Sequence, residues 1–130
     1  MTTTPTSLVT GVDFVTIPAK DIDESVRFYG TVLGLPFVKQ CGDMPGHEFQ
    51  AGNLTLAVMD PTAFGQEFRP HSLPIALQVD DVEAARANLE AQGVEFITDN
   101  MDSGVCHQAI FRDPAGNALG IHHRYAPKPG

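Results

Sequence analysis

The sequence is poor in basic residues. Of its 130 residues, 8 are Lys or Arg and 16 are Asp or Glu, so the formal net charge is 8 − 16 = −8. Proteins that bind a nucleic-acid backbone neutralise its phosphates with Lys and Arg. The charge balance therefore predicts no nucleic-acid partner, and it suits neutral or cationic ligands.

The sequence also lacks a long apolar run, a basic leader and a cysteine framework. No apolar stretch approaches the roughly 20 residues that span a bilayer, and the Thr- and Pro-rich start has no signal-peptide pattern. The only cysteines, Cys41 and Cys106, do not form a disulfide framework. These features predict a cytoplasmic protein without a membrane partner.

What the sequence does contain is an internal repeat. A strand-like run, an Asp helix cap, an apolar helical stripe and a Gly stop surround Asp21 and again Asp81, 60 residues later. A Gly-Asn turn between strand-like runs occurs at Gly52 and again at Gly116, 64 residues later. Each half therefore predicts a strand, a helix and three further strands.

The repeat predicts the domain organisation and the fold class. We expect one domain over 1–130, built of a module at 12–59 and a module at 74–124 that are joined by a linker at 60–73. The predicted fold is α+β, with two βαβββ modules, a curved mixed or mainly antiparallel sheet that forms a crevice, and one helix per module on the outer face.

Two motifs resemble those of the vicinal oxygen chelate superfamily. The first is D-I-D-E-S-V-R-F-Y-G followed by L-G-L over 21–35, and the second is F-R-D-P-A-G-N over 111–117, which is similar to the closing aromatic-x-Asp-Pro-x-Gly-Asn turn of that superfamily. The superfamily includes glyoxalase I, extradiol dioxygenases and bleomycin resistance proteins. The resemblance covers 12–124 and implies the two-module fold, but a fold alone does not define a function.

The resemblance also implies where a metal centre would lie. In enzymes of the superfamily, His or Glu residues on the first and last strand of each module hold a divalent metal. By the resemblance, the corresponding positions lie seven residues before each capping Asp and four residues after each turn Gly. They are Phe14, Leu56, Pro74 and Gly120. None of these side chains coordinates a metal. We therefore predict no metal ligand and no cofactor, and we expect no chemistry that depends on the usual metal.

The alternation of side chains along a strand extends these four positions into a predicted pocket. The pocket is expected to be apolar with a few polar groups, which is typical of small-molecule sites. The predicted ligand-binding residues are Phe14, Thr16, Glu48, Leu56, Val58, Pro74, Ala76, Gln78, Cys106, Gln108, Ile110, Gly120 and His122.

Three of these residues are candidates for chemistry. Glu48, Cys106 and His122 would together be the ligands of a divalent metal at a non-standard site. Alternatively, Cys106 is a nucleophile with His122 as its base, or Glu48 is a general base. The competing interpretations are that His122 forms hydrogen bonds in the pocket, that Cys106 is a small buried residue and that Glu48 is an exposed carboxylate.

The prediction is a metal-free protein that binds an apolar or aromatic small molecule, as in bleomycin resistance proteins, with antibiotic sequestration as its role. The alternative is an enzyme of the same superfamily, a lyase, isomerase or dioxygenase, with a non-standard metal or metal-free site. A third interpretation is an interaction protein with a vestigial cavity. The resemblance also implies a homodimer, because two-module members of the superfamily usually pair.

Overall fold

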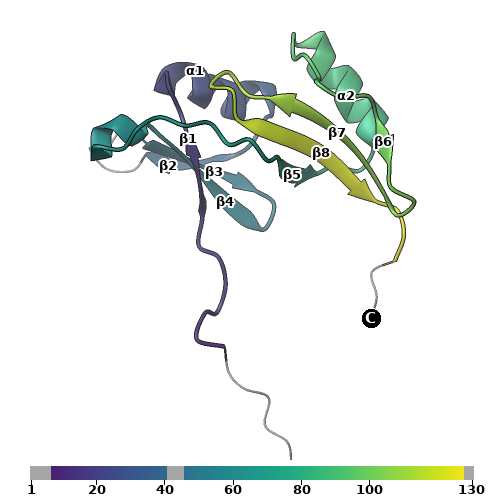
Figure 1. Ribbon diagram of the computed structural model, residues 1–130, viewed down its shortest axis with the longest axis horizontal. Helices are drawn as coiled ribbons and strands as arrows, with labels where there is room; N and C mark the ends of the chain where they lie inside the picture. The colour runs from purple at the N-terminus through teal and green to yellow at the C-terminus, as the bar shows by residue number, and fades with distance from the viewer. Residues whose placement is uncertain (1–6, 41–45, 128–130) are drawn as a thin grey trace, which may run out of the picture.

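The computed structural model describes residues 7–40 and 46–127, and Figure 1 shows two sheets side by side with both helices on the same side of them. The first half contains β1 (Val15–Pro18), α1 (Ile22–Arg27), a π-helical turn (Phe28–Val32), β2 (Phe37–Gln40), β3 (Gly46–Ala51) and β4 (Leu54–Met59). After a 3-10 turn (Pro61–Phe64), the second half contains β5 (Ile75–Gln78), α2 (Val82–Ala91), β6 (Met101–Asp102), β7 (Cys106–Arg112) and β8 (Ala118–Arg124).

The two sheets have the same topology. Their strand orders are β1-β4-β3-β2 and β5-β8-β7-β6. In each sheet the first strand pairs in parallel with the last, and the remaining pairs are antiparallel. The predicted α+β fold with two βαβββ modules is confirmed. β1 and β5, the first strands of the two modules, are edge strands.

Short-range signals explain where the helices begin and end. The side chain of Asp21 accepts a hydrogen bond from the Glu24 amide at 3.2 Å, and Asp81 accepts one from the Ala84 amide at 3.1 Å, so both predicted caps are N-caps. After the first helical segment, Gly34 takes a φ of 69°, a left-handed conformation that glycine adopts without a steric penalty. No helix of the described residues is long and apolar enough to cross a membrane.

The hydrophobic core lies between the helices and the sheets. It joins residues of both modules, because the Phe28 ring of the first module lies 6.3 Å from the Phe111 ring of the second. Within the first module, the Tyr29 ring lies 6.3 Å from the Phe49 ring. Since both helices cover the same side, each sheet has a second face that carries no helix (Figure 1).

A buried polar network fixes one module against the other. The Tyr29 hydroxyl donates to Asp113 Oδ2 at 2.6 Å. The Asn117 side-chain amide donates to the same oxygen at 2.8 Å and to the Pro18 carbonyl, at the end of β1, at 2.7 Å. Asp113 and Asn117 belong to the turn between β7 and β8, so this turn ties the second module to β1 and to the first helix.

Candidate functional site

Strand register decides which predicted residues share a face of the second sheet. Gln108 and Gln78 both pair with His122, and Ile110 and Ala76 both pair with Gly120. Paired residues point to the same side of a sheet, and the side chains of neighbouring core residues on these strands point to the helices. The helix-free face of the second sheet therefore carries these six predicted residues: Ala76, Gln78, Gln108, Ile110, Gly120 and His122.

Two further predicted residues belong to this face. Cys106 precedes Gln108 by two residues on β7, so its side chain points to the same side. A Cβ placed on Gly120 would lie 3.9 Å from the Pro74 Cβ and 4.0 Å from Ile110 Cγ1. Pro74 therefore lies beside Gly120, as the sequence predicts.

The first sheet departs from the prediction. Leu56 pairs with Val15, Val58 pairs with Ile17, and both leucine and valine are 0% exposed in the core beneath the helices. The helix-free face instead carries Thr16 and Glu48, whose common pairing partner is Ala57. The expectation that Leu56 and Val58 share a face with Glu48 and Thr16 is wrong.

The reason is the length of the two hairpin loops. Ala51 pairs with Leu54, which leaves two residues between β3 and β4, whereas Arg112 pairs with Ala118, which leaves five residues between β7 and β8. Phe49 and Phe111 both point to the core, and they pair with Leu56 and Leu119. Leu56 follows its turn glycine by four residues but Leu119 follows its own by three, so the same count from the glycine gives opposite faces. The first-sheet residue that faces the same way as Gly120 is Ala57.

The corrected positions do not fit the metal centre of the superfamily's enzymes. Phe14, which is 53% exposed, Ala57, Pro74 and Gly120 offer no imidazole, thiolate or carboxylate. Over residues 7–40 and 46–127, no group of three or more His, Cys, Asp or Glu residues is arranged to hold a metal ion. We therefore derive no step through a metal, and the absence of a cofactor stays a prediction.

The three candidates for chemistry are not brought together. Cys106 and His122 line one cavity of about 340 Å³ together with Gln108. Glu48 lies on the other sheet, where its carboxylate is 4.0 Å from Lys39 Nζ. Cys106 is a free thiol, and Cys41 lies outside the described residues. Within one chain, a site made of Glu48, Cys106 and His122 does not form.

The two modules meet in a groove of about 630 Å³ between the β3–β4 turn and β5. Three predicted residues line it: Leu56, Ala76 and Gln78. The residues that the sequence prediction missed are mostly aliphatic, and they are Leu35, Ala51, Gly52, Asn53, Leu54, Ile75, Leu77 and Asp80. A second hollow of about 460 Å³ shares Leu35, Leu77, Gln78 and Asp80 and continues toward α2.

The chemistry of this groove suits binding. Leu35, Leu54 and Leu77 give it apolar walls, and Gln78 and Asp80 place an amide and a carboxylate among them. A largely apolar lining with few polar groups is typical of small-molecule sites. Of the Cys106, Glu48 and His122 side chains considered for catalysis, none lines the groove.

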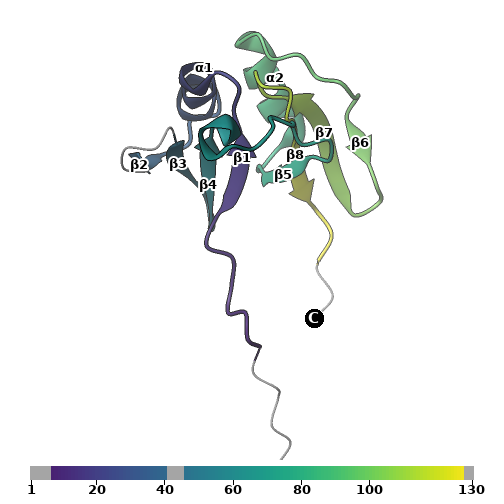
Figure 2. The same ribbon diagram turned by 60° about the vertical axis from the view of Figure 1, so that its left-hand side comes forward.

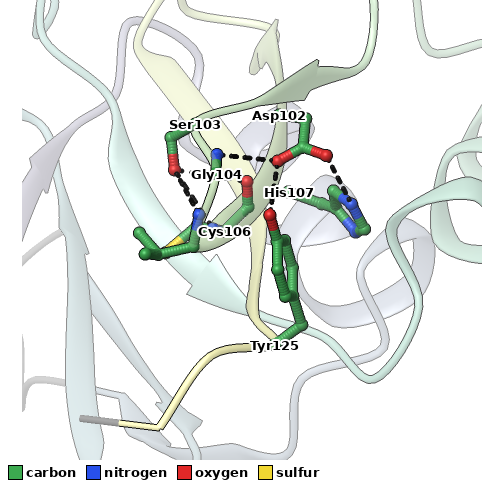
Figure 3. Close-up of polar contacts among 7 residues, drawn as sticks. Asp102, Ser103, Gly104, Cys106, His107 and Tyr125 are labelled. Atoms are coloured by element: carbon green, nitrogen blue, oxygen red, sulfur yellow. Dashed lines mark hydrogen bonds and ion pairs between the residues drawn. The ribbon is translucent and has the colours of Figure 1, made fainter.

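A polar cluster surrounds Asp102, at the far edge of the second sheet (Figure 3). Asp102 Oδ1 accepts hydrogen bonds from the Gly104 amide and from the Tyr125 hydroxyl, each at 2.8 Å, and His107 Nε2 lies 3.3 Å from Oδ2. The Gly104 amide and then the Tyr125 hydroxyl lower the pKa of Asp102, and the hydrogen bond to Asp102 raises the pKa of Tyr125. Sequence reasoning missed this cluster, since Tyr125 follows Asp102 by 23 residues.

Comparisons with known proteins agree with this architecture. An uncharacterized protein of Mycolicibacterium smegmatis is 31% identical over 111 residues, which are 83% of this chain and 89% of that protein. TnmS3, an antibiotic binding protein from Streptomyces sp. CB03234, is 25% identical, with a TM-score of 0.77 over 92% of this chain and 99% of its own.

A superfamily member from Sphaerobacter thermophilus is 22% identical and has a TM-score of 0.78 over 91% of this chain and 100% of its own; that likeness shows the fold alone. The two βαβββ modules thus define the vicinal oxygen chelate class of folds. The profile of the Glyoxalase/Bleomycin resistance protein/Dioxygenase superfamily matches residues 11–121. The chain belongs to this superfamily.

Proposed function

We propose that the chain binds an apolar or aromatic small molecule in the groove beside β5 and releases it unchanged. The observation that carries the proposal is the composition of the groove, about 630 Å³ of mostly aliphatic lining with Gln78 and Asp80 among it. This volume lies within the usual range for small-molecule sites, roughly 300–1,000 Å³. The similarity to TnmS3, an antibiotic binding protein, supports antibiotic sequestration as the role.

Further features of the proposal concern the ligand's charge, the assembly and the location of the protein. Asp80 in the groove and a net charge of −8 favour a neutral or cationic ligand over an anion. The protein is proposed to act as a homodimer in the cytoplasm. The ligand's apolar body would fill the groove, and a hydrogen-bonding group on it would be recognised by Gln78.

The test is a thermal-shift screen of aromatic natural products, followed by equilibrium dialysis of each compound that raises the melting temperature. A ligand present at 100 times its Kd stabilises the native state by about 2.7 kcal/mol. Mass spectrometry of the recovered compound should show it unchanged. A product that accumulates with time would contradict binding without turnover.

Two matched variants locate the site. Ala76→Trp places a large side chain in the groove and should weaken binding at least about tenfold, since it removes the volume that the ligand fills. Ala87→Trp, on the exposed side of α2, adds the same side chain elsewhere and should leave the Kd unchanged. Equal affinity in both variants would show that the groove is not the site.

A further inference from the structure

Within the described part of the chain, one edge of β5 has no partner strand. On its other side β5 pairs with β8, and the Val79 amide, directly after β5, donates to the His122 carbonyl at 2.9 Å. Because backbone groups alternate in direction along a strand, the N–H and C=O groups of Ala76 and Gln78 point away from β8. Among the described residues, no backbone group pairs with them there. They can therefore pair with an extended molecule that lies along this edge.

The open edge of β5 lines the proposed ligand groove. All four residues of β5, Ile75, Ala76, Leu77 and Gln78, belong to the lining. Successive side chains of a strand point to opposite faces, so a site on one face would include only every second residue. The groove therefore runs along the edge of the strand, where the unpaired backbone groups lie. Both views place β5 on the side of the second sheet that is turned toward the first sheet (Figures 1 and 2).

The groove walls beside this edge are aliphatic. Leu35 and Leu54 come from the first module, and Ile75 and Leu77 come from the second. Among the described residues of the lining, Asp80 alone carries a charge, and it lies two residues beyond the C-terminal end of β5. A ligand in the groove thus meets a row of backbone donors and acceptors between apolar walls, with a carboxylate near one end of the row.

We propose that the groove binds an extended, peptide-like compound whose amide groups pair with the open edge of β5 and whose positive charge lies near Asp80. The outward backbone groups of Ala76 and Gln78 repeat at about 6.6 Å, twice the rise per residue, and the amides on one side of an extended peptide repeat at the same distance. β5 spans roughly 13 Å at 3.3 Å per residue, so the paired part of the ligand is about four residues long.

This ligand class rests on the proposed function, because it is named for the same groove. A ligand without polar groups would displace water from the N–H and C=O groups of Ala76 and Gln78 and leave them without hydrogen bonds, which is costly. Amide groups restore these bonds, and apolar side groups fill the aliphatic walls. Strand addition of this kind gives affinity through the backbone and specificity through the side chains. The carboxylate of Asp80 and the net charge of −8 favour a cation.

The first experiment is calorimetric titration of the full chain with acetylated tetrapeptide amides. Each peptide contains three valines and one lysine, and the lysine occupies each of the four positions in turn. At least one peptide should bind with a Kd below about 1 mM, and Ala76→Trp should weaken it while Ala87→Trp should not. If no peptide binds, the peptide-like class is wrong, whereas compounds of the thermal-shift screen that bind in the groove would still support the proposed function.

N-methylation of the bound peptide tests strand pairing without a change in the protein. Successive N–H groups of an extended peptide point to opposite sides. Methylation at successive residues should therefore alternate between a loss of affinity of at least about tenfold and little change. An equal effect at successive residues, or no effect at any of them, would overturn the pairing with β5.

Ala76→Pro tests the same pairing from the side of the protein. It removes an N–H that points away from β8, so the hydrogen bonds within the sheet stay intact. The affinity for the peptide should fall at least about tenfold, and the melting temperature of the variant checks that the fold is kept. Unchanged affinity in Ala76→Pro would overturn the role of this edge, and the methylated peptides decide the question if the variant does not fold.

Asp80→Asn tests the charge of the ligand. Asp80 is exposed, and exposed ion pairs are weak, so the variant should bind the lysine peptide about threefold less tightly. A peptide with norleucine in place of lysine should bind both proteins equally. Asp99→Asn removes the same charge from an exposed position outside the groove and should leave both affinities unchanged. Equal affinity of Asp80→Asn and Asp99→Asn for the lysine peptide would overturn the preference for a cation.

Discussion

The molecule contains two tyrosine–aspartate hydrogen bonds of nearly equal length in opposite environments. The Tyr29–Asp113 bond is 2.6 Å long and lies between the modules, with the tyrosine 0% and the aspartate 5% exposed. The Tyr125–Asp102 bond is 2.8 Å long and lies on the surface at the edge of the second sheet. The same two functional groups therefore connect the two modules in the core and form a solvent-exposed contact at the surface.

The comparison shows how burial sets the consequence of a hydrogen bond. At the surface, water forms a hydrogen bond with a group that has lost its partner. In the core no water reaches that group, so it is left without a hydrogen bond. Burial, and then the charge of Asp113, raise the pKa of Tyr29 well above its usual range. The pKa of Tyr125 is also raised, but its main cause is the hydrogen bond to Asp102.

The largest effect is expected for Asp113→Ala. The Asp113 carboxylate accepts hydrogen bonds from the Tyr29 hydroxyl, the Asn117 side chain and the backbone amides of Ala115 and Asn117. Its removal leaves buried donors without a partner, at about 1–3 kcal/mol each. We expect the free energy of unfolding to fall by about 3–5 kcal/mol, measured by urea denaturation.

The matched control is Asp99→Ala. Asp99 is an exposed aspartate in the segment between α2 and β6, and surface substitutions usually change stability by less than about 0.5 kcal/mol. An equal loss of unfolding free energy in both variants would show that the buried hydrogen bonds of Asp113 are not the source of the effect.

Tyr29→Phe should have an intermediate effect with a distinctive pH dependence. At neutral pH it removes one buried hydrogen bond, at about 1–2 kcal/mol. Because the native pKa of Tyr29 lies above the unfolded value of about 10, its contribution is complete below pH 10 and is lost as the pH rises further. Above pH 10 the unfolded chain loses the Tyr29 proton while the folded protein keeps it. The unmutated protein should therefore lose about 1.4 kcal/mol of unfolding free energy per pH unit above 10, and Tyr29→Phe should not show this loss.

Urea denaturation between neutral pH and pH 11 measures this difference. The chain has two tyrosines, so the ultraviolet titration of tyrosinate in each Tyr→Phe variant reports on the other tyrosine alone. Tyr125→Phe is the control, and it should keep the alkaline loss of stability. An unchanged slope above pH 10 in Tyr29→Phe would contradict the role of burial.

Local signals predicted the fold well. The Asp21 and Asp81 caps, the Gly34 stop and the two Gly-Asn turns each depend on neighbouring residues, so the repeat could be found without knowledge of the packing. Tyr29, in the first of the two motifs, is fully buried. Its hydroxyl bond to Asp113 could not be predicted, because the two residues are 84 positions apart.

The site was predicted less well, for a geometrical reason. The face assigned to Leu56 depended on counting through a hairpin loop, and an error of one residue turns every side chain to the opposite face. Ala76 and Gln78 escaped this error because their strand was placed from the helix cap at Asp81. The groove itself joins β5 to a turn of the other module, and only the packing of the two modules brings these segments together.

The smallest effect is expected for Tyr125→Phe. The variant keeps the ring that lies 4.7 Å from the ring of His107, and water replaces the hydroxyl at Asp102. Since the native pKa of Asp102 is lowered, its contribution to stability is present above an unfolded pKa of about 4 and is lost as the pH falls through the native value. At pH 7 the melting temperature should stay within about 2 °C of the native protein.

NMR titration of the Asp102 carboxyl measures the local effect. Its pKa should rise toward the ordinary value in Tyr125→Phe but stay below it, because the Gly104 amide still donates to Oδ1. Below the native pKa of Asp102 the carboxyl is neutral in both proteins, so their melting temperatures should converge. A melting temperature lowered as far as in Tyr29→Phe would show that the surface pair anchors the end of β8, and the contrast with the buried pair would no longer hold.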